Sequence, residues 1–194
     1  MNSRRFVVLT LTVWILAACT GCVHLVKVSY QPGAALAPTL PCPVALNLSK
    51  EFTSYTYVTP QPGTDHWQAS LGPALQKYAI YVAQSVFGDV QVLDGQPPRS
   101  DAKLLLVPRV TSADLRMDLP CSGALGVHWD FNDPKTGQTL FSMPLQCEYA
   151  HPFKFFSNPN RAISEVVNHL MTNLTSITIQ RFDASKDLQR FSGH

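Results

Sequence analysis

The sequence has 194 residues, of which 45% are hydrophobic and 14% charged, so it fits one globular domain and excludes a disordered chain. Ten glycines, five cysteines and a single long apolar run exclude a collagen-like repeat, a disulfide-dense miniprotein and a polytopic membrane protein. Without Arg4 and Arg5, which we expect to be removed, thirteen basic residues balance thirteen acidic ones. We therefore expect no nucleic-acid partner, because phosphate binding needs clustered cations.

Residues 1–18 are typical of an export signal. A short basic start is followed by thirteen uncharged residues at positions 6–18 (FVVLTLTVWILAA). A helix of that length spans about 20 Å, which is shorter than the hydrocarbon core of about 30 Å. The pattern favours a signal peptide over a buried strand or helix, which is the alternative. A twin-arginine signal stays open, although Phe6 directly follows the Arg4-Arg5 pair.

The signal ends in Leu16-Ala17-Ala18-Cys19, which resembles the lipobox of bacterial lipoproteins. The resemblance implies that Cys19 becomes the mature N-terminus and carries a diacylglyceryl group on its sulfur, usually with a third acyl chain on its amine. Several acyl chains are enough for stable anchoring. Thr20 is not the Asp that marks inner-membrane retention, so the resemblance favours an outer-membrane lipoprotein that faces the periplasm.

The mature chain divides by composition into three parts. Residues 19–43 are rich in proline and small residues and predict a tether that lifts the domain off the bilayer. Residues 44–182 carry the periodic apolar patterns of a single domain. Residues 183–194 form a polar tail that we expect to be frayed.

Alternating apolar residues predict strands at 44–48, 90–93 and 103–111, with a further strand or extended segment at 52–58. A helix is expected from a Ser70 cap through Phe87 to the stop at Gly88, and a second one from Asn158-Pro159 to about Arg181. Residues 125–131 and 141–149 alternate on either side of turn residues 132–137 and predict a β-hairpin. The order indicates an α+β fold, in which two amphipathic helices pack on one face of a largely antiparallel, mixed sheet.

With Cys19 acylated, four cysteines remain for an oxidising compartment. If Val127 faces Phe141 in the hairpin, Cys121 faces Cys147, so we expect a disulfide between those two. A bridge between Cys22 and Cys42 would follow by elimination, without a register to support it.

Motifs for catalysis are missing from the sequence. The six histidines lack the spacing of a zinc site, and no nucleophile motif or phosphate-binding glycine loop occurs. Carboxylates such as Asp130 and Asp133, or Glu148 and Glu165, are more typical of solvated charges than of an acid–base pair. We expect no enzyme activity, no metal and no cofactor.

Three aromatic rings, Phe153, Phe155 and Phe156, lie beside an expected loop. They either close the core over the last helix or form a docking patch for a partner or the membrane.

The order of these elements, from the lipobox to the closing helix, resembles the YajG-like lipoproteins and, more distantly, the lipopolysaccharide-assembly lipoprotein. The resemblance implies no catalytic position. The leading hypothesis is a membrane-anchored, non-enzymatic accessory, assembly or binding factor that contacts an envelope protein. The alternative is a small-molecule or lipid binder that uses a pocket between helices and sheet.

Overall fold

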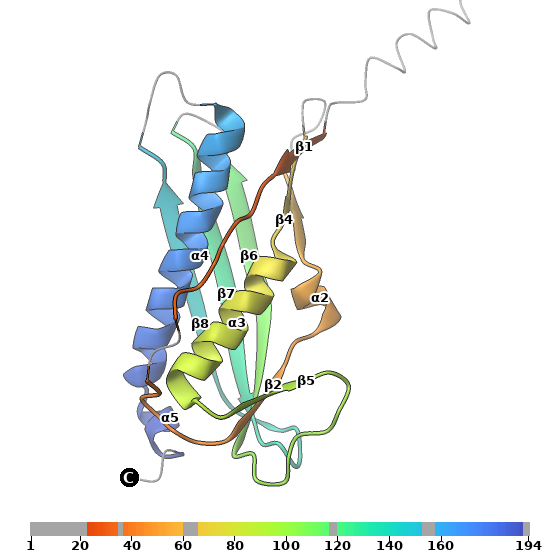
Figure 1. The fold of residues 1–194 in the computed structure, drawn as a ribbon, viewed down its shortest axis with the longest axis vertical. Helices are drawn as coiled ribbons and strands as arrows, with labels where there is room; N and C mark the ends of the chain where they lie inside the picture. Colours follow the sequence, from red (N-terminus) through yellow and green to blue (C-terminus); the bar gives the residue numbers. More distant parts are fainter. Residues whose placement is uncertain (1–22, 35–36, 60–65, 117–119, 153–157, 192–194) are drawn as a thin grey trace, which may run out of the picture.

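The computed structural model describes residues 23–34, 37–59, 66–116, 120–152 and 158–191 (Figure 1). Its elements are β1 (Val23–Val26), β2 (Val44–Asn47), α2 (Lys50–Thr53), β3 (Thr56–Val58), β4 (His66–Ser70), α3 (Gly72–Phe87), β5 (Val90–Leu93), β6 (Leu104–Arg116), β7 (Ser122–Asn132), β8 (Thr139–Ala150), α4 (Pro159–Asp183) and α5 (Lys186–Gln189).

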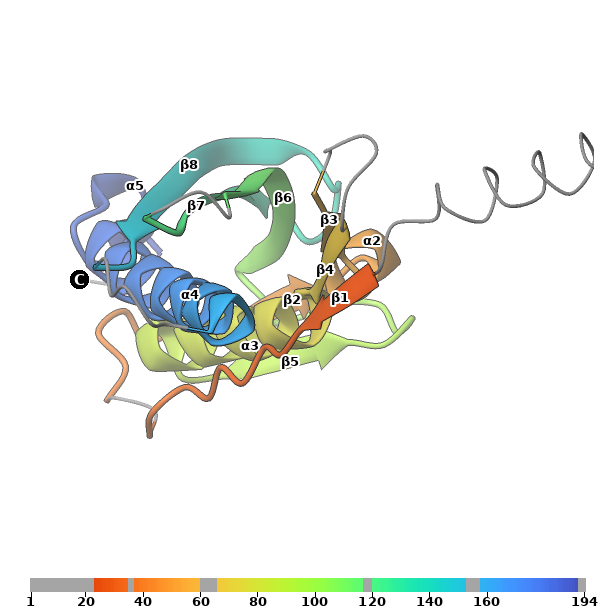
Figure 2. The same cartoon turned by 90° about the horizontal axis from the view of Figure 1, so that it is seen from above.

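The larger sheet has five strands in the order β5-β2-β6-β7-β8. Strand β2 runs parallel to both β5 and β6, whereas β6, β7 and β8 are antiparallel neighbours. Seen from above, the sheet curves around α3 and α4, with β8 on one side of the helices and β5 on the other (Figure 2). This arrangement confirms the predicted α+β fold with a mixed sheet and packed helices. A second sheet, β1-β4-β3, was not predicted.

The two long helices use different local signals. Helix α4 begins as expected, because the Asn158 side chain accepts a hydrogen bond from the Asn160 N–H. Helix α3 instead has Leu71 at its N-cap, without a side-chain cap, and not the expected Ser70. It ends at Gly88, whose φ of 75° favours glycine. Ten of the sixteen α3 residues are buried, so this helix lies inside the curve of the sheet.

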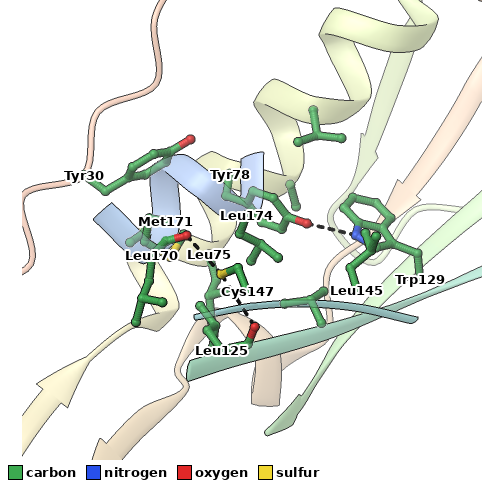
Figure 3. Packing of buried hydrophobic residues seen from close by; sticks show 14 of the residues in the cluster. Tyr30, Leu75, Tyr78, Leu125, Trp129, Leu145, Cys147, Leu170, Met171 and Leu174 are labelled. Atoms are coloured by element: carbon green, nitrogen blue, oxygen red, sulfur yellow. Dashed lines mark hydrogen bonds between the residues drawn. The ribbon is translucent and has the colours of Figure 1, made fainter. Parts of the chain in front are cut away.

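The core is centred on large aromatic side chains that α3, α4 and the sheet enclose. Trp129, Tyr78, Phe131 and Phe182 are fully buried. The Trp129 indole N–H donates to the Tyr78 hydroxyl oxygen at 3.1 Å (Figure 3), and Tyr78 in turn lies 2.7 Å from the Thr178 hydroxyl. Thr178 donates to the Leu174 carbonyl at 2.6 Å. The polar atoms of this cluster therefore satisfy one another without water.

The hairpin forms, but its register contradicts the predicted disulfide. Val127 pairs with Leu145 rather than with Phe141, and Cys147 pairs with Leu125. The reason is the position of the turn, which runs from Asp133 to Gln138 and so lies one residue later than the expected 132–137. Register shifts further between Phe131 and Asn132.

The expected bond between Cys121 and Cys147 is therefore wrong, because the register places the two residues four positions apart along the strands. The Cys147 Sγ lies 3.4 Å from the Leu170 carbonyl and 3.7 Å from the Leu125 carbonyl, as Figure 3 shows. Cys42 carries a free, buried thiol, and Cys22, its expected partner, lies outside the described residues.

The segment expected to be a tether packs on the domain wherever it is described. Strand β1 pairs in parallel with β4, and the chain then crosses α3 and α4 toward β2 (Figure 1). We call residues 27–34 and 37–43 the strap. Its side chains Tyr30, Leu40 and Cys42 are buried, and the Leu40 N–H donates to the Val86 carbonyl. Apolar side chains hidden among the prolines explain the difference from a free tether.

The expected polar tail also differs from a frayed end over its described part. Residues 186–189 form the short helix α5, which Ser185 caps by accepting a hydrogen bond from the Leu188 N–H. Leu188 is buried. Phe191 also packs against the core, and the Lys103 ammonium donates to the Phe191 carbonyl at 3.1 Å, so these contacts hold the turn on the domain.

Candidate functional site

The described structure leaves several predicted site residues untested. Cys19 and Cys22 precede the first described residue, and Phe153, Phe155 and Phe156 lie in the gap between 152 and 158. Lipidation and the aromatic docking patch therefore stay predictions. Within the described ranges, no helix is both long and apolar enough to cross a bilayer.

A groove of about 400 Å³ lies where the strap crosses α3 and α4. The residues that line it are Tyr30, Gln31, Pro32, Gly33, Tyr81, Thr172, Thr175, Ser176, Ile179 and Gln180. The strap provides the first four, α3 provides Tyr81, and α4 provides the rest. The alternative hypothesis expected a pocket between the helices and the sheet, but this groove lies between the helices and the strap.

Two tyrosines from different elements hold the strap at this groove. The buried Tyr30 hydroxyl lies 2.7 Å from the Thr175 Oγ1, which itself donates to the Met171 carbonyl at 2.7 Å. Tyr30 is thus the donor to Thr175. Tyr81 donates its hydroxyl proton to the Ala34 carbonyl at 3.1 Å. Burial raises the pKa of Tyr30, so its hydroxyl stays protonated and able to donate.

The lining of the groove consists of hydroxyls, amides and apolar surface. None of its ten residues is an acid, a base, a histidine or a cysteine. Hydroxyl and amide groups recognise a ligand by hydrogen bonds in both directions, without fixing a charge on it. The groove is therefore suited to binding a neutral polar ligand, and its lining lacks a side chain that would activate a nucleophile.

A second polar cluster joins the end of β8 to the start of α4. His151 is buried, with Nε2 lying 2.6 Å from Glu165 Oε2 and Nδ1 lying 2.8 Å from the Pro152 carbonyl. Arg161 donates to the other Glu165 oxygen at 2.9 Å. The hydrogen bond from His151, followed by that from Arg161, lowers the pKa of Glu165. These contacts lock the two elements together on either side of the undescribed residues 153–157.

The carboxylates singled out in the sequence have separate partners. Asp130 lies 3.1 Å from His128 and 3.6 Å from Arg109 on the sheet, whereas Asp133 accepts hydrogen bonds from backbone N–H groups in the hairpin turn. Across the part of the chain that the structure describes, no three metal-ligating side chains gather. The clusters present are typical of structural ion pairs.

Sequence reasoning missed the groove because its parts lie far apart in the chain. Tyr30 and Thr175 are separated by 145 positions, and the prolines around Tyr30 are typical of a linker. The usable signal was a large aromatic residue within the expected tether. A second signal was the repeat of Thr172, Thr175 and Thr178 at helical spacing next to the apolar stripe of α4.

Comparisons with known proteins show the fold. No family model and no curated protein matches the sequence. A Helicobacter pylori structure described as a neuraminyllactose-binding hemagglutinin homolog has a TM-score of 0.50 at 12% identity, covering 87% of this chain and 96% of its own. A DUF330 protein of Xanthomonas campestris gives 0.44 at 12% identity, covering 85% of this chain and 100% of its own.

A minor lipoprotein of Acinetobacter baumannii gives a TM-score of 0.38 at 13% identity, covering 76% of this chain and 94% of its own. At such low identities the likeness concerns architecture and not activity. The chain therefore shares its α+β architecture with the Helicobacter pylori structure, whose TM-score is 0.50.

Proposed function

We propose that the protein is a lipoprotein of the outer membrane that faces the periplasm and acts by binding, without catalysis, as an accessory or assembly factor. The observation that carries the proposal is the Leu16-Ala17-Ala18-Cys19 motif after a short apolar segment. The YajG-like order of elements supports the envelope role. The groove supports binding, since its lining offers hydrogen bonds but no acid–base pair.

The anchor is tested by mass spectrometry of the protein purified from membranes. The expected N-terminal peptide begins at Cys19 and carries the mass of a diacylglyceryl thioether. Cys19→Ala should leave the leader uncleaved or release the protein from the outer-membrane fraction. Cys22→Ala is the matched control and should keep the diacylglyceryl group on Cys19 and leave the protein in the outer-membrane fraction. An unmodified Cys19 in a protein with an intact leader would overturn the proposal.

The partner is tested by photo-crosslinking in intact cells. A photoreactive residue at Gln180, on the exposed rim of the groove, should yield a discrete adduct with an envelope protein. The same residue at Lys135, in the β7–β8 turn, is the control and should yield none. Equal adducts at both positions would argue against the groove as the binding surface.

The second candidate function is small-molecule binding in the same groove. Its uncharged hydroxyl and amide lining favours a neutral sugar over an anionic one or an acyl chain. The Helicobacter pylori protein is described as a neuraminyllactose-binding hemagglutinin homolog, so lactose and sialyllactose form a useful pair of probes. Calorimetry should show lactose binding at least as strongly as sialyllactose, and Gln180→Ala should weaken it. Stronger binding of sialyllactose would contradict the interpretation that the uncharged lining favours a neutral sugar.

A further inference from the structure

The small sheet exposes an apolar patch on one of its faces. Leu25 of β1 and Val58 of β3 pair with Gln68 of β4 from opposite sides, so the three side chains form one row. Leu25 is 74% exposed and Val58 is 51% exposed. Val23, two residues before Leu25 on the same face, is 58% exposed. We call Val23, Leu25, Gln68 and Val58 the open face.

The opposite face of this sheet is part of the core. Its row Val26, Ala69 and Tyr57 is buried throughout. Strands β1 and β3 therefore carry apolar residues on both faces of the small sheet, although the rest of the domain covers only one of these faces. A half-covered sheet in water would favour polar residues on its outer face. The open face thus carries apolar side chains that packing within the described chain does not explain.

The patch is confined to the end of the sheet where β1 begins. The next row on the same face contains Thr56 and Ser70, which pair with each other and are both exposed and polar. Figure 1 shows β1 at one end of the molecule and α5 near the other. The apolar side chains therefore gather toward the start of the described chain and not over the whole sheet.

The length of chain before β1 indicates what covers this face. Only three residues lie between Cys19 and Val23, and the four steps from one to the other span about 14 Å at most. If the sulfur of Cys19 holds acyl chains in the bilayer, β1 starts at or just above the headgroup region, which is about 5 to 7 Å deep. Apolar residues held at that height can enter the boundary between headgroups and acyl chains.

We propose that the open face rests on the phospholipid surface, so that the domain sits on the membrane in a fixed orientation with the β7–β8 turn pointing away. This inference rests on the acylation of Cys19 proposed above. The strap, packed across α3 and α4, transmits that orientation to the whole domain, because no free tether separates β1 from the core.

The test uses the acylated full-length protein reconstituted in phosphatidylethanolamine and phosphatidylglycerol vesicles. An environment-sensitive fluorophore on Gln68→Cys should be quenched by lipids that carry a quencher just below the headgroup, and it should be shielded from aqueous iodide. The same fluorophore on Lys135→Cys, in the turn, should show the reverse. Mass spectrometry of Cys19 on the same sample separates failure of the anchor from failure of this proposal.

A double variant and a control variant test whether the apolar side chains of the open face hold it on the lipid. Leu25→Ser combined with Val58→Ser should raise iodide accessibility at position 68 on the order of tenfold, since two apolar side chains no longer hold the face on the lipid. Leu140→Ser is the matched control, because Leu140 is also exposed but lies on β8, and it should change nothing. Thermal melting verifies that the variants stay folded.

Two results would overturn the proposal in an acylated sample. Free access of iodide to position 68 would mean that the face stays in water. Shielding from both iodide and the lipid quenchers would mean that a protein covers it, and shielding that grows with protein concentration would identify a second copy of the chain.

Discussion

The two sheets of this protein place their tryptophans in opposite environments. Trp129, in the larger sheet, is fully buried and its N–H reaches the Tyr78 hydroxyl. Trp67, in the smaller sheet, is partly exposed and stacks on His24 with ring centroids 4.7 Å apart. The larger sheet is thus stabilised by a closed core, whereas the smaller one joins the domain by one covered face. The difference indicates where stability resides and where surface is available for contacts.

The largest effect is expected from Trp129→Ala. Removing this buried ring leaves a cavity between the sheet and α3, which costs about 3 to 5 kcal/mol of unfolding free energy. Trp67→Ala is the matched substitution in the small sheet and should cost about 1 kcal/mol, mostly from the lost ring stacking. Urea unfolding measures both. Equal losses would mean that the two sheets are one cooperative core.

A smaller loss is expected from Tyr78→Phe, which removes one hydroxyl and leaves the ring. The buried Trp129 N–H then loses its acceptor, and the Thr178 oxygen loses its donor. An unsatisfied buried donor costs about 1 to 3 kcal/mol. Tyr81→Phe is the control, because its hydroxyl binds one carbonyl at the partly exposed strap and should cost about 0.5 kcal/mol or less.

The thiol of Cys147 should be inert and should make stability depend on alkaline pH. Burial raises its pKa to about 11 from an ordinary value of 9.0. The unfolded chain therefore ionises first, so the contribution of Cys147 to stability is constant below about pH 9 and falls as pH rises from 9 toward 11. Cys147→Ala should remove that part of the alkaline loss.

Alkylation and reduction test the same thiol against the rejected disulfide. Native protein at pH 8 should resist iodoacetamide at Cys147 until it unfolds. Adding a reductant should leave the melting temperature unchanged. A fall in melting temperature on reduction would restore a disulfide to the hairpin and contradict the register that pairs Cys147 with Leu125.

The smallest effect is expected at Glu165, whose side chain is 40% exposed. Its pKa is lowered in the folded state from an ordinary value of 4.5, so its contribution is complete above that pH and is lost as pH falls through the folded pKa. Glu165→Gln should therefore flatten the acid limb of the stability curve slightly.

The sequence predicts elements well where one periodic face meets a single core. Helix α4 with its Asn158 cap, the Gly88 stop of α3 and both hairpin strands follow from local patterns. The first part of residues 52–58 was misjudged, because Ser49 caps a helical turn by accepting from the Phe52 N–H. The cap lies just before the window in which the aromatic residues suggest a strand.

What the sequence does not predict depends on contacts between distant segments. Paired residues of β1 and β4 are 43 positions apart and the strands run in parallel, so neither strand has a local turn that indicates its partner. The groove needs the strap to return over α4, and nothing near Tyr30 identifies Thr175 as its partner. The predicted hairpin register is wrong because the turn lies one residue later than expected and a further register shift follows at Phe131, which moves the pairing along both strands.

Strand β2 is early in the chain but central in its sheet, between β5 and β6. Val44 pairs with Val90 on one side and with Leu104 on the other. When the chain is synthesised or passes through a pore, β2 emerges before β5 and β6. The pairing residue of β6, Leu104, follows about sixty residues after Val44, so β2 lacks this neighbour until then. Such non-local pairing slows folding and leaves an unpaired apolar strand exposed for that time. We expect the emerging chain to need a holding chaperone until residue 104 has followed.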